Sequence, residues 1–321
     1  MRGKNQWIAL GDVMLLAVAV VWGTSYGVVE SALVFYPVLG LLALRFGITF
    51  LVLSPTLRHL RHASKATIFG LLGTGILLLG IFLAETYGVL HTRAANAAFL
   101  ISLCVVLTPL AEWALLKRRP SGLEWTAVAL SVLGAALLTG EGEWVFNAGD
   151  ALILVAALLR ALQMCLIKQI TATSNLPALT VTAVQTGVVA LASTLLLFAL
   201  VPNPIDALLS MEDAGTFWRY LAYLVLACTL FAFFAQNYAI KRSSPTRVAL
   251  LMGSEPAFGA LFAMVWLNEV ISVQGWMGGG LIIAASLLAT VRWKSLGAWR
   301  HRNLSPTTPR ASMKDGHARQ R

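Results

Sequence analysis

Ten apolar segments, each about as long as a bilayer is thick, constrain this chain more than any other feature. The hydrocarbon core of a bilayer is about 30 Å thick, and a helix needs about 20 apolar residues to cross it. Hydrophobic residues make up 58% of the chain and charged residues 12%, whereas soluble domains carry about 25% charged residues. The sequence therefore excludes an ordinary soluble protein and predicts an all-α polytopic membrane protein. The ten expected transmembrane helices are Ile8–Val29, Phe35–Leu53, Thr67–Tyr87, Ala94–Leu116, Leu123–Gly140, Ala148–Ile167, Leu176–Val201, Trp218–Ile240, Thr246–Leu267 and Val273–Trp293.

Lys and Arg residues alternate with these segments in a way that orients the chain. The two tails and every second connector carry 20 of the 24, and the opposite connectors carry only Arg93 and Arg219. Because Lys and Arg concentrate in cytoplasmic loops, both termini are predicted to be cytoplasmic. This distribution also accounts for the net charge of +10 without a nucleic-acid partner.

Matched positions in the two halves predict an internal duplication. Each pair recurs five expected helices later, with separations of 138 to 151 residues. Since five is odd, the second half must cross the membrane in the opposite direction to the first, which is the inverted-repeat architecture of many secondary transporters. The pairs are Gly11-Asp12 with Gly149-Asp150, Tyr87 with Tyr238, Pro109 with Pro256, and Trp125 with Trp276.

The expected domains follow from this duplication. Residues 1–143 form the first five-helix repeat, and residues 144–294 form the second, inverted repeat. Residues 295–321 are polar and basic, and we expect them to form a disordered cytoplasmic tail that lies against anionic lipid.

Three charged residues fall near the middle of expected helices. At 1.5 Å per residue, Arg45, Arg160 and Glu255 all lie roughly 15 Å into their segments. Each costs roughly 2.5–3.5 kcal/mol in the membrane if unpaired. We expect the three to border one aqueous cavity between the repeats, either as internal salt bridges or as a site for solute or a coupling proton. Their surplus positive charge suits an anionic or zwitterionic solute.

Other polar and helix-breaking residues supply further candidates. Pro256 removes the donor to the carbonyl of Met252, and Pro109 removes the donor to that of Val105, so both are candidate helix breaks. Trp22, Asn96 and Gln163 are candidate pathway residues, with interhelical hydrogen bonding as the alternative. The carboxylates of Glu85 and Glu112 lie nearer segment ends, and we expect them to snorkel to the interface.

Several classes of chemistry have no residues to carry them. The three cysteines lie in apolar segments without metal-ligand spacing. No nucleotide-binding P-loop sequence occurs, and all five histidines lie in connectors or tails. We therefore expect no catalytic residues, no metal and no cofactor.

The motifs together resemble a known family. Trp22-Gly23, Arg45-Phe46, Ala94-Ala95-Asn96-Ala97 and Glu255-Pro256 occur in the order typical of the drug/metabolite transporter superfamily, and most resemble its EamA-type permeases. The resemblance covers residues 8–293 and implies an inner-membrane permease, often an exporter of amino acids, metabolites or drugs. It implies that Trp22, Arg45, Asn96 and Glu255 line the pathway.

The sequence thus favours a secondary transporter that moves a small solute by alternating access, as a monomer or homodimer. Midplane charges and broken helices support this interpretation. A membrane-embedded lipid-modifying enzyme is the alternative, and a structural or sensory membrane protein is a third.

Overall fold

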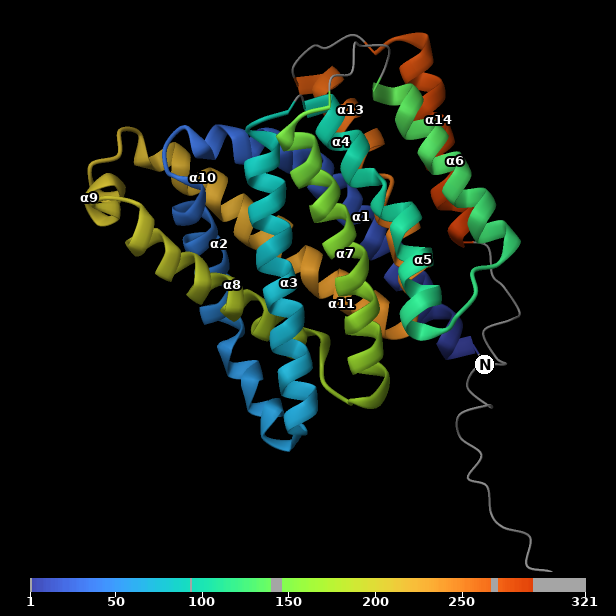
Figure 1. Cartoon of the computed structure of the whole chain (residues 1–321), viewed down its shortest axis with the longest axis horizontal. Helices are drawn as coiled ribbons and strands as arrows, with labels where there is room; N and C mark the ends of the chain where they lie inside the picture. Colours follow the sequence, from blue (N-terminus) through green and yellow to red (C-terminus); the bar gives the residue numbers. More distant parts are fainter. Residues whose placement is uncertain (1, 93, 140–145, 267–270, 291–321) are drawn as a thin grey trace, which may run out of the picture. The chain divides into compact units, whose positions relative to one another are not determined.

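The computed structural model describes residues 2–92, 94–139, 146–266 and 271–290, and every regular element within these ranges is helical (Figure 1). The expected tail, residues 295–321, lies outside the described residues. The first half contains seven of the described helical elements, and α7 (Ala148–Thr173) begins the second half. The seven are α1 (Arg2–Leu33), α2 (Val38–Leu53), the 3₁₀ helix η1 (Ser54–His62), α3 (Lys65–Val89), α4 (Ala94–Ser102), α5 (Cys104–Leu116) and α6 (Gly122–Thr139).

The remaining elements complete the second half. α9 and η2 have six residues each, and η2 is a π-helical turn inside a longer helix. They are α8 (Ala178–Leu200), α9 (Pro204–Leu209), α10 (Ala214–Val225), η2 (Leu226–Phe231), α11 (Ala232–Arg242), α12 (Pro245–Met252), α13 (Glu255–Trp266) and α14 (Val273–Thr290).

Local sequence explains where several helices begin. Ser64 accepts a hydrogen bond from the backbone N–H of Thr67 and caps α3. Asn147 and Asp150 form a reciprocal capping box at the start of α7. Pro37 and Pro177 precede α2 and α8 in extended conformation. A side chain that binds the free N–H groups of the first turn stabilises a helix by about 1 kcal/mol.

Two expected helices are broken near their centres. The segment expected at Ala94–Leu116 divides at Leu103 into α4 and α5, and Pro109 lies inside α5 rather than at the break. In the second half, Gly253 and Ser254 separate α12 from α13. Pro256 lies in the first turn of α13, where the N–H that proline lacks has no intrahelical partner to lose.

Seven of the described helical stretches are long and apolar enough to cross a membrane alone, and the bent α1 raises this to eight. Some of the ten expected transmembrane helices are therefore too short or too interrupted to cross a membrane as single helices. The apolar part of α6, Gly122–Leu138, is one of the shorter apolar helices. The pair α12 and α13 has 8 and 12 residues, because the break divides the expected span in two.

Helices of the two halves pack against each other in pairs. In Figure 1, α3 lies beside α7, and α6 lies beside α14 at one edge. The other main pairs are α2 with α8, α3 with α8, α5 with α7, and α1 with α11 and α13, and α5 also packs against α12. Gly134 and Gly278 allow the α6–α14 approach, since a Cβ on Gly134 would lie 2.6 Å from the carbonyl oxygen of Gly278.

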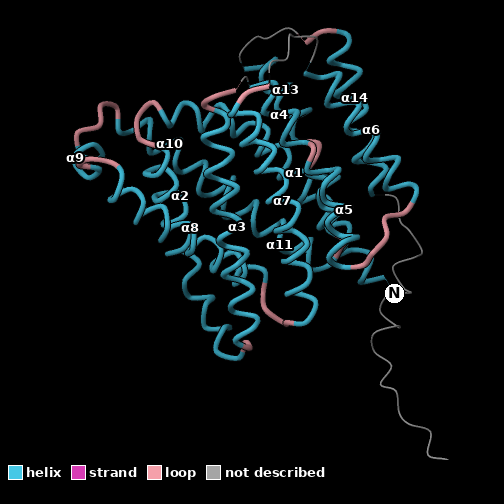
Figure 2. The backbone as a smooth tube through the Cα atoms, viewed as in Figure 1, coloured by secondary structure: helices cyan, strands magenta, loops and turns pink. Residues whose placement is uncertain are grey.

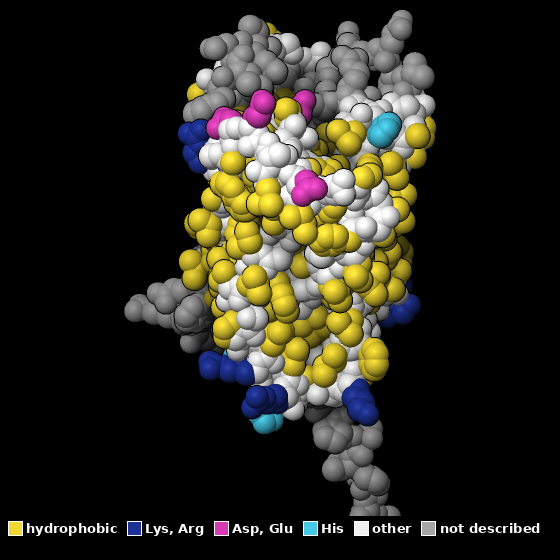
Figure 3. All heavy atoms as spheres, turned by 90° about the vertical axis from the view of Figure 1, so that its left-hand side faces the viewer, with side chains coloured by type: hydrophobic (Ala, Val, Ile, Leu, Met, Phe, Trp, Pro, Cys, Tyr) yellow, Lys and Arg dark blue, Asp and Glu magenta, His cyan; other side chains and the backbone are white. Residues whose placement is uncertain are grey.

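The polar and apolar surfaces are segregated. Figure 2 shows that the loops gather at the two ends of the helices. The face in Figure 3 is mainly hydrophobic in its middle, with Asp and Glu near one end and most Lys and Arg near the other. We call these ends the acidic end and the basic end. An apolar band between two polar ends is the surface of a multi-pass membrane protein.

Candidate functional site

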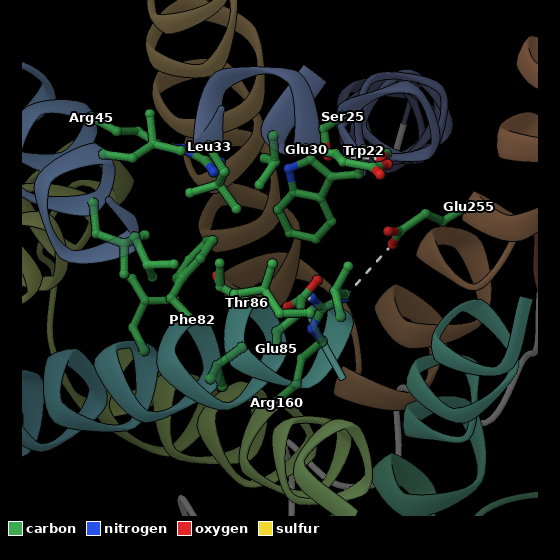
Figure 4. Close-up of a pocket in the computed structure, with 18 of the residues that line it drawn as sticks. Trp22, Ser25, Glu30, Leu33, Arg45, Phe82, Glu85, Thr86, Arg160 and Glu255 are labelled. Carbon is green, nitrogen blue, oxygen red and sulfur yellow. Dashed lines mark hydrogen bonds and ion pairs between the residues drawn. The ribbon is translucent and has the colours of Figure 1, made fainter. Parts of the chain in front are cut away.

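A cavity of about 280 Å³ lies among the two halves of the bundle. Its walls come from α1, α2, α3, α7, α11 and α13, and Figure 4 shows side chains from several of these helices converging on it. The lining runs from Glu255 and Arg160 out to the exposed Glu30 and Leu90, near the ends of α1 and α3. The cavity thus reaches from the middle of the bundle towards the acidic end.

Five of the six candidate pathway residues line this cavity. They include all three midplane charges, so Arg45, Arg160 and Glu255 border one cavity. The side chain of Asn96 lies outside the described residues, although its backbone is part of α4. The five are Trp22, Arg45, Arg160, Gln163 and Glu255.

Arg160 joins two carboxylates from different halves of the chain. Its Nη2 lies 2.9 Å from Glu85 Oε2 on α3, and its Nη1 lies 3.6 Å from Glu255 Oε2 on α13. The guanidinium also lies 5.2 Å from the ring centroid of Trp22. The expectation that Glu85 snorkels to the interface is therefore wrong. Its carboxylate faces the cavity because an internal arginine is available as its partner.

Arg45 is held differently, by a hydroxyl and a carbonyl. Its Nε donates to Thr229 Oγ1 at 2.6 Å, and its Nη2 donates to the carbonyl of Cys228 at 3.3 Å. The rings of Phe46 and Phe82 lie 5.4 and 5.1 Å from its guanidinium carbon. Arg45 is only 5% exposed. Within the described part of the chain it forms no ion pair.

Trp22 and its neighbour Gly23 bring α13 to the cavity. Trp22 Nε1 donates to the carbonyl of Cys228 at 2.9 Å, which fixes the indole against η2. A Cβ on Gly23 would lie 2.7 Å from both the carbonyl oxygen of Glu255 and the backbone nitrogen of Gly259. Only glycine permits this approach. The Trp-Gly pair thus places an aromatic wall and the Glu255 backbone side by side.

Two amide side chains, Gln163 and Gln236, also line the cavity. Gln163 Nε2 donates to the carbonyl of Thr74 at 2.9 Å, which is the interhelical bond given as the alternative to a pathway role. Gln236 also lines the cavity, and its Oε1 is buried without a hydrogen-bond partner among the described residues. Buried acceptors are nearly always satisfied in folded proteins. Gln236 Oε1 is therefore a cavity-side acceptor that no described group uses.

The two helix breaks meet beside Glu255. A Cβ on Gly253 would lie 2.5 Å from Val105 Cγ2, so α5 packs directly on the gap between α12 and α13. A small void of about 20 Å³ lies there, lined by residues that include Val105, Met252 and Pro256. Arg160 and Glu255 border this void as well as the main cavity.

A second charge cluster lies at the basic end. Glu112 Oε2 accepts hydrogen bonds from the N–H and hydroxyl of Thr246 at 3.0 and 2.5 Å and lies 3.1 Å from Arg118 Nη1. Arg118 also binds Glu124 at 2.6 Å. Burial alone would lower the pKa of Arg118, but the carboxylates of Glu112 and Glu124 outweigh burial and raise that pKa.

Glu112 was expected to snorkel, and that expectation is also wrong. Its residue is 1% exposed. The carboxylate caps the first turn of α12 instead, because the free N–H groups of that turn and Arg118 supply the partners that water would give it.

The described residues do not form a metal-binding cluster. Among the described residues, no three His, Cys, Asp or Glu side chains lie close enough together to hold a metal ion. The three cysteines are buried as free thiols.

The family assignment rests on both halves of the chain. The EamA-like transporter family matches residues 9–140 and again residues 147–291. The chain belongs to the EamA-like transporter family. Its membership confirms the resemblance seen in the motifs, and it makes this protein a membrane transporter.

Several transporters resemble this chain over most of its length. A transporter of Archaeoglobus fulgidus is 26% identical over 88% of this chain and 86% of its own length. The inner membrane transporter YedA of Escherichia coli is 25% identical over 86% of this chain and 89% of its own length. A probable terminal-alkyne amino-acid exporter of Streptantibioticus cattleyicolor is 24% identical over 87% and 92%.

Solved structures share the fold. One crystal structure superposes with a TM-score of 0.71 and covers 88% of this chain and 96% of its own. At 18% sequence identity, this likeness shows the fold alone.

Proposed function

We propose that this EamA-family protein is an inner-membrane secondary transporter that moves a small solute through the described cavity by alternating access. The observation that carries the proposal is the triad of Glu85, Arg160 and Glu255 on the cavity wall. Charges inside a membrane bundle are costly and mark solute or ion pathways. The transporter names of the relatives favour transport over the alternative of a lipid-modifying enzyme.

Two observations support the inverted-repeat architecture, with residues 1–143 and 144–294 as the repeats. The family matches the chain twice in succession. Helix pairing is also reciprocal, because the third span of each half packs against the first span of the other: α3 against α7, and α11 against α1. Such reciprocity is what a two-fold axis between two five-helix repeats requires. Rocking of one repeat against the other would then expose the cavity at alternate ends.

Glu255 is our candidate for a coupling proton. Its ion pair with Arg160 is the longer of the two, at 3.6 Å against 2.9 Å for Glu85. If Glu255 takes up a proton, Arg160 keeps Glu85 as its partner. The guanidinium therefore does not become an uncompensated buried charge, which would be strongly destabilising.

Reconstitution tests the transport proposal. We expect purified protein in liposomes to accumulate members of a panel of radiolabelled metabolites, amino acids and drug-like amines, and Arg160→Met to abolish this uptake. Arg58→Gln is the matched control, because Arg58 is exposed in η1 and lines no part of the cavity. Equal uptake by wild type and Arg160→Met would contradict the proposal.

The proposed orientation has its own test. With both termini in the cytoplasm, a C-terminal fluorescent-protein fusion is expected to fluoresce, and a C-terminal alkaline phosphatase fusion is expected to be inactive. Active phosphatase on the full-length chain would contradict the ten-span topology. Fluorescence of the same chain in gel filtration would show whether it is a monomer or a homodimer.

A further inference from the structure

Arg45 is the one described cavity arginine that lacks a carboxylate partner. The sequence alone suggested a surplus positive charge shared by Arg45 and Arg160. The position of Glu85 changes that count, because Arg160 now has two carboxylates within 4 Å. The positive charge available to a solute therefore belongs to Arg45.

The guanidinium of Arg45 retains unused hydrogen-bond donors. A guanidinium has five N–H groups, and the protein takes one from Nε and one from Nη2. Nη1 has no hydrogen-bond partner among the described residues. The residue is 5% exposed and lines the cavity, and Figure 4 shows its side chain extending from α2 towards the other labelled residues.

The backbone around Arg45 holds the side chain in one position. Thr229, its Nε partner, lies in the π-helical turn η2 and donates to the carbonyl of Leu224, five residues earlier. π turns often occur at functional sites because they redirect backbone groups. Phe46 and Phe82 also pack against the guanidinium, with ring centroids 5.4 and 5.1 Å from its carbon.

We propose that Arg45 is the binding residue for a carboxylate of the transported solute, whose apolar part lies against Phe82 and Leu78. A planar guanidinium matches a carboxylate with two parallel hydrogen bonds. A buried cation without an anion is costly, and a bound carboxylate removes that cost. This inference rests on the proposed function of the cavity and names the solute class that the cavity takes.

The opposite wall selects what the rest of the solute carries. Glu85 and Glu255 together exceed Arg160 by one negative charge, and Gln236 Oε1 is an unused acceptor. With Arg45 included, the two glutamates and the two arginines have a net charge of zero. A zwitterion with a carboxylate at Arg45 and an ammonium group towards the carboxylates preserves that balance, whereas a plain amine does not.

Three probes of matched shape test the proposal: norleucine, hexanoate, which lacks its amine, and pentylamine, which lacks its carboxylate. Binding is measured by the shift of the thermal unfolding midpoint of the purified protein in lipid nanodiscs. We expect wild type to bind norleucine most tightly, hexanoate next and pentylamine least. Arg45→Gln is expected to weaken norleucine and hexanoate by at least about tenfold and to leave pentylamine unchanged.

Two further variants keep the result interpretable. Arg45→Lys retains the positive charge but lacks the planar guanidinium that can donate two parallel hydrogen bonds. We expect it to retain part of the affinity for hexanoate. Arg58→Gln removes an exposed arginine and is expected to change nothing. If Arg45→Gln does not fold, a reduced affinity of folded Arg45→Lys for hexanoate still supports the proposal. An unchanged affinity of Arg45→Lys for hexanoate contradicts it.

The contradicting outcomes separate this inference from the proposed function. Wild type that binds pentylamine as tightly as norleucine, or binds neither carboxylate up to its solubility, overturns the role of Arg45. Uptake by liposomes that is sensitive to Arg160→Met but not to Arg45→Gln would leave the transport proposal intact and remove only this one.

Discussion

Trp22 on α1 and Arg45 on α2 donate to the same backbone carbonyl, that of Cys228 in the π-helical turn η2. Trp22 Nε1 lies 2.9 Å from this oxygen and Arg45 Nη2 lies 3.3 Å from it. A carbonyl has two lone pairs and can accept both bonds. The first half of the chain therefore attaches two cavity-lining side chains to a single point of the second half.

We predict that Gly23→Val disrupts the cavity, because a Cβ there would lie 2.7 Å from the backbone of Glu255 and of Gly259. Overpacking of this kind typically destabilises a protein by about 1–3 kcal/mol. The thermal unfolding midpoint and uptake should both fall. Gly27→Val is the matched control on the same helix, since nothing lies within 4 Å of its Cβ position. Equal effects of the two variants would contradict the close α1–α13 approach.

We predict that Glu255→Gln remains folded and binds solute, but loses transport driven by a pH gradient. Arg160 keeps its 2.9 Å partner Glu85 in this variant, so no buried cation is left unpaired. Uptake by liposomes with and without an imposed pH gradient measures the loss. The comparison variant Glu85→Gln removes the shorter pair and should lower the unfolding midpoint more. Wild-type transport and stability in Glu255→Gln would refute both a proton role and a structural role.

We predict that Asp12→Asn loosens closure of the basic end. Asp12 and Arg247 form a bidentate pair between α1 and α12, with distances of 3.2 and 2.5 Å. The side chains are 15% and 11% exposed, and such a pair contributes about 1 kcal/mol. A cysteine replacing cavity-lining Ser25 should react faster with an impermeant thiol reagent supplied from the basic end.

The exposed Asp206 of α9 supplies the control for this experiment, since Asp206→Asn makes the same chemical change away from the pair. The reversed pair, Asp12→Arg with Arg247→Asp, should restore the slow rate. An unchanged rate in folded Asp12→Asn would contradict a closing role.

We predict that Glu112→Gln destabilises the fold by about 1–3 kcal/mol. The carboxylate is buried and accepts from Thr246 and Arg118 at the start of α12. An amide keeps the shape but gives up the charge-assisted bonds. Thermal unfolding measures the change, with Glu212→Gln as the control on an exposed glutamate. A stability loss no greater than that of Glu212→Gln would show that the cap is dispensable.

The sequence by itself determined the membrane class, the family and the charges at the centre of the bundle. Apolar length and charge alternation depend only on the transfer of each segment into lipid, which is a local property. The same is true of Arg45, Arg160 and Glu255, because depth along a helix follows from residue number. All three line the cavity.

Tertiary structure decided which groups meet. The sequence placed Glu85 and Glu112 near the membrane interface. In the structure Glu85 pairs with Arg160 and Glu112 accepts from Thr246, and both partners lie far away in the sequence. The break at Leu103 rather than Pro109, and the π turn that holds Arg45, likewise carry no local signal. Their positions follow from packing between the two halves, because a buried charge settles where a partner exists, and only the assembled bundle supplies that partner.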